Sequence, residues 1–210
     1  MIEKIIKIIL NTHGSTMLKK LSKNFSPFQI LITAILSARA KDEITEKISK
    51  ILLKRYPSAK ELAKADLKEI KQIIKPIGFY NNKAKMIIKC AKQILTIYHN
   101  KVPKEMKELL TLSGVGRKVA GCVRVYAFHL DSLPVDVHVH RVANRIGLVH
   151  TKNPFETERA LKKITPKKMW KYVNEAFVRL GRSVCLPRNP KCKECPVKNY
   201  CDYFKKNKFI

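Results

Sequence analysis

Acidic residues are scarce in this sequence. Its 210 residues include 16 Asp and Glu against 44 Lys and Arg, which gives a formal net charge of +28. Such a field attracts polyanions, and nucleic acid is the leading candidate. A lysine-rich coat shared by all proteins of a lysine-biased organism is the other explanation, and composition alone leaves it open. No basic run is longer than two residues, so we expect a folded basic surface rather than a disordered basic tail.

A long hydrophobic run is also missing, and a leader peptide is not expected. The longest mostly apolar run, Ile30–Ala38, is far shorter than the roughly 20 residues that cross a bilayer. Charged side chains at positions 3, 4 and 7 interrupt the first isoleucines, a pattern that predicts an amphipathic helix rather than a signal peptide. We therefore expect a cytoplasmic, nucleoid-associated monomer with no membrane partner.

Strand-like alternation is almost absent, apart from a few residues around Val135. Ser26 and Pro27 mark the start of one helix, and Asp66 with Glu69 marks another. Apolar residues recur at helical spacing in the segment that Pro57 ends and in stretches 83–98, 104–110, 118–127, 139–149, 155–164 and 168–180. The sequence thus predicts an all-α protein. Cys90 and Cys122 lie within these helical patterns, and we expect both to be buried.

Four cysteines crowd into the C-terminal part of the chain with the spacing C-x6-C-x2-C-x5-C: Cys185, Cys192, Cys195 and Cys201. No histidine lies beyond His150, so the four thiolates would form the whole ligand set of a metal centre. Disulfides are not expected in a cytosolic protein. Zinc is one candidate, although its sites usually contain two close cysteine pairs, and a 4Fe-4S cluster is the other.

Glycine is rare as well, yet three of the seven glycines (Gly114, Gly116 and Gly121) fall within eight positions. A tight turn between two helices needs the positive φ that glycine adopts without steric cost. When such a turn opens onto a helix N-terminus, the backbone N–H groups there bind phosphate oxygens. An ordinary glycine-rich connection between helices is the alternative.

Together these motifs resemble the endonuclease III family of DNA glycosylases and AP lyases. LSGVGRKVAGCV resembles the family's helix-hairpin-helix, LPVDVHVHRVANRIGLV its catalytic aspartate segment, and the cysteine spacing its 4Fe-4S motif. LSARAKD and IGFYNNKAKMIIK also look like family segments. The resemblance implies two all-α lobes, namely a six-helix barrel over residues 20–130 and an iron–sulfur domain formed by residues 1–19 and 131–210. It also implies that duplex DNA with damaged bases or abasic sites binds over the cleft between them.

The resemblance also implies a chemistry. Lys118 would attack C1′ of the damaged nucleotide, and the resulting imine would lead to β-elimination 3′ to the lesion. A lysine amine attacks only when neutral, a form that both the helix N-terminus and Arg117 favour. Asp136 would stabilise positive charge on the sugar and accept protons, although helix capping is its ordinary role. His138 and His140 lie at i, i+2, on different helix faces, so structural roles are expected for them.

Residues that contact DNA follow from the same resemblance. A flipped base leaves a gap in the duplex, and Arg39 and Phe79 would fill it, although the family often has glutamine and leucine at these positions. A buried aromatic is the alternative for Phe79. The remaining expected contacts are the hairpin residues Gly114, Val115, Gly116 and Arg117, and the loop residues Arg188 and Lys191.

The expected activity is excision of oxidised pyrimidines followed by strand cleavage. Glycosylases of the same superfamily that act on thymine, uracil or adenine in mispairs are alternatives. An alternative of another class is a DNA-binding iron–sulfur protein without catalytic activity. Lys118 together with Asp136 argues against that alternative, because binding alone requires neither residue.

Overall fold

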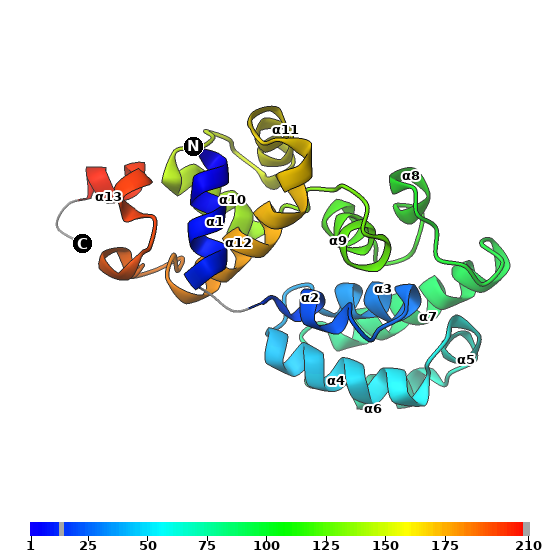
Figure 1. The fold of residues 1–210 in the computed structure, drawn as a ribbon. Coiled ribbons are helices and arrows are strands. Elements are labelled where there is room, and N and C mark those ends of the chain that lie inside the picture. Colours follow the sequence, from blue (N-terminus) through cyan, green and yellow to red (C-terminus); the bar gives the residue numbers. More distant parts are fainter. Residues whose placement is uncertain (13–14, 208–210) are drawn as a thin grey trace. The chain divides into compact units, whose positions relative to one another are not determined.

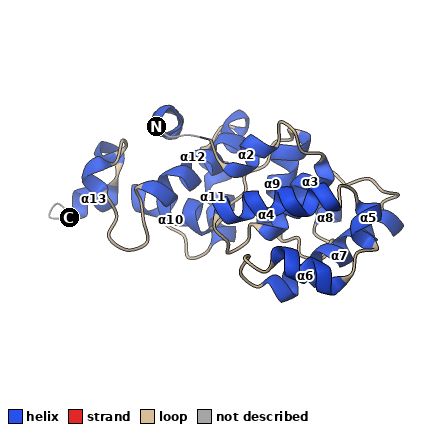
Figure 2. Ribbon diagram, turned by 90° about the horizontal axis from the view of Figure 1, so that it is seen from below, coloured by secondary structure: helices blue, strands red, loops and turns tan. Residues whose placement is uncertain are grey.

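The computed structural model describes residues 1–12 and 15–207 and divides into two compact units. The central unit spans Met17–Leu130, and the terminal unit combines Met1–Thr16 with Asp131–Ile210 (Figure 1). Each unit has its own hydrophobic core. The described residues form helices and no strand (Figure 2), which confirms the predicted all-α fold class. Within those residues, no helix is long and apolar enough to cross a membrane.

The central unit is built around α3, of which eight residues are buried. Ser26 and Gln29 form a reciprocal capping box at its start, with Pro27 at the first helical position, as the sequence predicts. The helices of this unit are α2 (Met17–Leu21), α3 (Pro27–Leu36), α4 (Asp42–Arg55), α5 (Ala59–Ala63), α6 (Leu67–Ile74), α7 (Tyr80–Thr96), α8 (Met106–Leu109) and α9 (Arg117–Phe128). Because α3 packs against both α7 and α9, it fixes these two helices relative to one another.

Two details of the central unit differ from the sequence prediction. Ile44, Ile48 and Ile51 recur at helical spacing, which predicts one apolar face for α4. Ile51 is nevertheless 48% exposed, because the buried face of this helix is formed by Thr45, Ile48, Ser49, Leu52 and Leu53. Asp66 caps α6 as predicted, whereas Glu69 turns away from the cap to Tyr56 and Arg55. The short helices α2 and α5 were not delimited from sequence, because five residues show too little periodicity.

The terminal unit contains α1 (Ile2–Thr12), α10 (Val137–Ile146), α11 (Pro154–Ile164), α12 (Trp170–Ser183), α13 (Asp202–Lys206) and the 3-10 turns η1 (Lys167–Met169), η2 (Cys192–Glu194) and η3 (Lys198–Tyr200). The N-terminal segment is the predicted amphipathic helix, with Ile2, Ile5, Ile6 and Ile9 buried. It packs on α12, which joins the two ends of the chain in one core.

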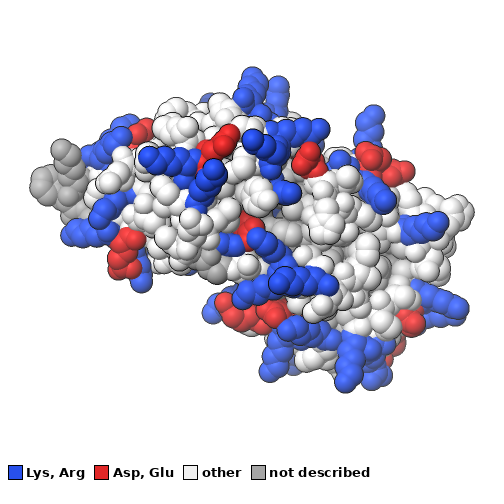
Figure 3. All heavy atoms as spheres, viewed as in Figure 1, with Lys and Arg blue, Asp and Glu red and all other residues white. Residues whose placement is uncertain are grey.

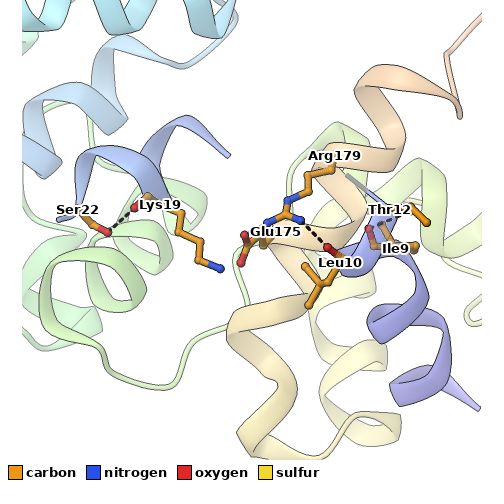
Figure 4. A network of polar contacts seen from close by, with 7 residues as sticks. All are labelled: Ile9, Leu10, Thr12, Lys19, Ser22, Glu175 and Arg179. Atoms are coloured by element: carbon orange, nitrogen blue, oxygen red, sulfur yellow. Dashed lines mark hydrogen bonds and ion pairs between the residues drawn. The ribbon is translucent and has the colours of Figure 1, made fainter. Parts of the chain in front are cut away.

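A buried ion pair on α12 is connected to α1 by a hydrogen bond (Figure 4). Arg179 pairs with Glu175 one turn earlier on α12 and donates to the carbonyl oxygen of Leu10, 3.3 Å away. The side chains of Arg179 and Glu175 are only 8% and 3% exposed. Because an isolated buried charge is costly, each residue depends on the other. Thr12 ends α1 by bonding to the carbonyls of Ile8 and Ile9.

Candidate functional site

The glycine-rich segment forms a tight turn between α8 and α9. The amide of Val115 donates to the carbonyl of Leu112, 3.1 Å away, and Gly114 has φ +80°, the geometry of a type II turn. A Cβ at Gly114 would lie 3.1 Å from Ile35 Cγ2 and from Met86 Cβ. Glycine is therefore required here both by backbone conformation and by packing.

The glycine-rich turn leads directly into α9, so that Lys118 lies in the first turn of this helix. Gly116 occupies the N-cap, where it has extended backbone and no capping side chain. Gly114, Gly116 and Arg117 are exposed, whereas Val115 is buried and Lys118 half-buried. Val115 can thus offer a ligand only its backbone. An uncapped helix start with exposed glycines is suited to a phosphate, because its amides and the helix dipole favour an anion.

A second exposed element of the central unit pairs Arg39 with Phe79. Both residues have left-handed backbone, with φ of 53° and 62°. The guanidinium carbon of Arg39 lies 5.6 Å from the centroid of the Phe79 ring, and that ring is 60% exposed. The alternative of a core aromatic at position 79 is therefore wrong. A Cβ on Gly78 would touch the carbonyl oxygen of Arg39 at 3.4 Å, so the two loops lie side by side.

Lys83 lies beneath these loops and is almost fully buried. Its ammonium nitrogen donates to the carbonyls of Leu36, at 2.8 Å, and Ala38. Burial lowers the pKa of Lys83 from 10.5 to about 8. The two bonds connect the first turn of α7 to the last residue of α3 and to Ala38, directly before Arg39, and so join the loops that present Arg39 and Phe79.

In the terminal unit, Asp136 is the N-cap of α10. Its Oδ1 accepts from the amides of His138, at 2.9 Å, and Val139, at 3.0 Å. Neither bond involves Oδ2, and the residue is half-buried. The capping role expected of this aspartate is therefore present, and it leaves one carboxylate oxygen outside the cap.

The two histidines after Asp136 have the structural roles that the sequence predicts. His138 Nδ1 lies 3.2 Å from a guanidinium nitrogen of Arg141, and burial lowers the pKa of His138. His140 Nδ1 lies 2.7 Å from the hydroxyl of Thr157. A Cβ at Gly181 would lie 2.9 Å from His138 Cβ, so this glycine permits α12 to pack closely on α10.

The four clustered cysteines line one cavity of the terminal unit, together with Arg145 and Tyr203. Among the described residues, no three His, Cys, Asp or Glu side chains converge closely enough for a single metal ion. Four thiols around one cavity form the donor set of a 4Fe-4S cluster. Burial raises the pKa of the Cys195 thiol to about 11, so binding of a cluster to thiolates would release protons.

Two arginines of α10 hold the first cysteine and the loop after it. Arg141 donates to the carbonyls of Cys185, at 3.0 and 2.9 Å, and Gly181, at 2.7 Å. Arg145 donates to Leu186 O at 2.6 Å and Pro187 O at 3.0 Å, with Cys185 Sγ at 3.5 Å. Their positive charge complements an anionic iron–sulfur centre with thiolate ligands.

The loop that these arginines support carries Arg188 and Lys191. Both side chains are exposed, and Lys191 lies 3.9 Å from Glu194. On the face drawn in Figure 3, Lys and Arg side chains are scattered, with Asp and Glu between them. Sequence-based prediction missed Lys83, Arg141 and Arg145, because their partners are distant in sequence and no local pattern marks them.

The sequence matches two protein-family models and is similar to known proteins. Residues 32–167 match the HhH-GPD superfamily of base excision DNA repair proteins, and residues 185–201 match the iron–sulfur binding domain of endonuclease III. Endonuclease III of Thermotoga maritima is 44% identical over 88% of this chain and 86% of that protein.

Two solved structures extend the similarity to nearly the whole fold. A non-covalent endonuclease III–DNA complex has a TM-score of 0.88 at 32% identity and covers 98% of this chain and 94% of that one. A trapped endonuclease III–DNA covalent intermediate has a TM-score of 0.83 at 33% identity and covers 91% and 93%.

Proposed function

Because the chain belongs to the endonuclease III family of HhH-GPD base excision repair proteins, a family of DNA glycosylases and AP lyases, we propose that it acts as a monomer on oxidised pyrimidines in duplex DNA. It would release the base and then cleave the strand 3′ to the abasic site. The observation that supports this most directly is the position of Lys118, half-buried in the first turn of α9 directly after the Gly114–Gly116 turn.

Lys118 acts as the nucleophile in this proposal. Its neutral amine attacks C1′, and the bond from C1′ to the base breaks as the bond to Nζ forms. The base leaves with the electron pair of that bond and receives, by way of Asp136, the proton that Nζ loses. The C1′–O4′ bond then breaks, O4′ takes its electron pair and a proton from solvent, and the protonated imine that remains makes the C2′ proton acidic. Loss of that proton expels the 3′ phosphate, so the strand is cut by β-elimination. Exposed Gly114 and Gly116 let the backbone approach a phosphate beside this nucleophile.

In this proposal, Asp136 supplies a negative charge near the sugar and accepts a proton. Because the amides of His138 and Val139 hold Oδ1, the carboxylate has a fixed orientation, and Oδ2 can face the sugar. A fixed carboxylate stabilises the positive charge that develops on the sugar as the base departs. It also accepts the proton that the amine loses when the imine forms.

The exposed pair of Arg39 and Phe79 would fill the gap left by the flipped nucleotide, because a ring held on a left-handed turn can stack between bases. Cys185, Cys192, Cys195 and Cys201 would hold the 4Fe-4S cluster, which would cross-link the C-terminal segment. The loop fixed by this cross-link would present Arg188 and Lys191 to backbone phosphates.

Borohydride trapping tests the nucleophile. Lys118→Gln should abolish the covalent adduct with abasic-site DNA and strand cleavage while leaving DNA binding nearly intact. Lys89→Gln, which changes an exposed lysine of α7, is the matched control and should trap like the wild type. Trapping by Lys118→Gln at the wild-type yield would exclude Lys118 as the nucleophile.

Duplexes that each carry one lesion test the substrate class. Thymine glycol, an oxidised pyrimidine, should be released faster than thymine or uracil opposite guanine, or adenine opposite guanine. Faster release from any of these mispairs would assign the chain to a mispair glycosylase instead. Tight binding to every duplex without base release or trapping would indicate a non-catalytic DNA-binding protein.

A further inference from the structure

The side chain of Gln93 bridges the last turn of α7 and the loop that begins the glycine-rich turn. Its Oε1 accepts from the amide of Ser113 at 2.8 Å, and its Nε2 donates to the carbonyl of Thr111 at 3.1 Å. One partner is a donor and the other an acceptor, so only one orientation of the amide satisfies both. Among the residue types, only glutamine and asparagine carry a carboxamide, which places a donor and an acceptor on the same carbon atom.

Ser113 occupies the second position of the type II turn that spans Leu112 to Val115. The positive φ at Gly114 and the bond from Val115 N to Leu112 O define this turn, and Ser113 is not among the residues with positive φ. Proline is common at this position, since it presets φ and has no N–H. Serine does neither, so the Ser113 amide in this half-buried turn needs an acceptor, which Gln93 provides.

Other contacts from α7 and its C-terminal end support the same loop. The hydroxyls of Tyr98 and Thr111 lie 2.8 Å apart, and Met86 is one of the two side chains that would meet a Cβ at Gly114. These contacts limit how closely α7 approaches the turn. The bonds to Gln93 differ from them because they hold backbone groups, the carbonyl of Thr111 and the amide of Ser113, and so fix the orientation of the two peptide groups that flank Leu112.

We propose that Gln93 is a positioning residue for the hairpin. It holds the peptide groups around Ser113 in the orientation that a proline would impose, and thereby fixes the amides at the start of α9 and the direction from which Lys118 approaches DNA. This inference rests on the proposed function, because the hairpin is taken as the element that binds the phosphate backbone.

Gln93→Leu tests the inference, because leucine is similar in size but makes neither bond. Binding is measured with a duplex that contains a tetrahydrofuran abasic-site analogue, and chemistry is measured by borohydride trapping on a natural abasic site. We expect the dissociation constant to rise about tenfold, since a half-buried amide loses its partner. Trapping at saturating DNA should slow less than binding weakens. Gln93→Glu keeps the acceptor but loses the donor, so its affinity should lie between wild type and Gln93→Leu.

Rescue by proline separates positioning from a general loss of stability. In the Ser113→Pro background, Gln93→Leu should raise the dissociation constant by less than about twofold, because no Ser113 amide remains to be paired and proline sets the turn. Gln72→Leu, on an exposed position of α6, is the matched control and should bind like the wild type. Thermal melting of each variant verifies that it is folded at the assay temperature.

Two results would overturn the inference. One is a Gln93→Leu variant that binds and traps like the wild type. The other is an equal loss of affinity with serine or proline at position 113, which would mean that Gln93 does not act through that amide. Neither result affects the proposed function, which is tested separately by borohydride trapping of the wild-type protein and by base release from the lesion-bearing duplexes.

Discussion

The guanidinium carbon of Arg39 lies over the ring of Phe79, 5.6 Å from its centroid, although the two residues are 40 positions apart. Both side chains are exposed, and both backbones are left-handed. Exposed aromatic and arginine side chains on strained turns are typical of positions that contact a ligand. The contact with Arg39 leaves the ring of Phe79 exposed, so the ring is free to stack on a DNA base.

Replacing the Phe79 ring should impair base flipping. Phe79→Ala removes a stacking surface worth about 1–3 kcal/mol per base, so we expect release of a damaged base to slow by about tenfold or more. Fluorescence of 2-aminopurine opposite the lesion should report less unstacking. Ile51→Ala, at another exposed hydrophobic position, is the control, and equal rates for the two variants would exclude a role of the ring in flipping.

Capping and catalysis by Asp136 can be separated with two substitutions. Asparagine also caps helices well, so Asp136→Asn should keep the melting temperature but slow base release by orders of magnitude, because the charge is lost. Asp136→Ala should lose about 1 kcal/mol of stability in addition. Single-turnover base release and thermal melting measure the two effects. Unchanged base release by Asp136→Asn would reduce the residue to a cap.

The four cysteines that line one cavity predict the metal content of the purified protein. Purified anaerobically, the protein should be brown, absorb broadly near about 400 nm and contain about four irons per chain. Cys195→Ser, which changes a thiol lining the cavity, should lower iron content and destabilise the terminal unit, as metal analysis and limited proteolysis will show. Stoichiometric zinc without iron would contradict the cluster assignment.

Burial of Lys83 predicts a pH dependence of stability. Its pKa is lowered from 10.5 to about 8, so the folded protein releases this proton at lower pH than the unfolded chain. Unfolding therefore takes up a proton between pH about 8 and 10.5, and stability rises with pH in that window. Below it, the full cost of burying the charge is present.

Urea unfolding of wild type and Lys83→Met measures this effect, because the variant has no titrating group at the position. The free energy of unfolding of the wild type minus that of the variant should increase across the window by at most about 3 kcal/mol. A difference that stays constant with pH would mean that the ammonium of Lys83 is fully solvated in the folded protein.

The loop after Cys185 should contribute to the salt dependence of DNA binding. Each phosphate contact adds about −0.9 to the slope of log K against log salt, and about five to seven contacts would give a slope near about −5 to −6. Arg188→Ala or Lys191→Ala should each make the slope shallower by about one. If neither changes it, the loop is solvated and the hairpin binds the phosphates without it.

Sequence periodicity and end signals were sufficient for the fold class and for most helices. Ser26 with Pro27, and Asp66, are local signals whose partners lie within three residues, and the helices begin where they predict. The buried positions of Cys90 and Cys122 follow from the same periodicity and are confirmed. Boundaries were less accurate. For the predicted helix 104–110 the structure has a shorter helix, Met106–Leu109, and the helix predicted at 83–98 begins earlier, at Tyr80. The residues at which a helix begins and ends depend on contacts outside the helix, which periodicity does not report.

The chemistry-bearing motifs were also local. Gly114 and Gly116 predict a turn before Lys118, and four cysteines at fixed spacing predict a metal centre, because backbone freedom and thiolate ligands are properties of residue types. What only the tertiary structure decided is which distant groups hold these motifs in place. Lys83 reaches the last residue of α3, and Gln93 reaches Ser113, 20 residues further on. Such bonds depend on how helices pack, and a hydrogen bond between side chain and backbone leaves no periodic trace in the sequence.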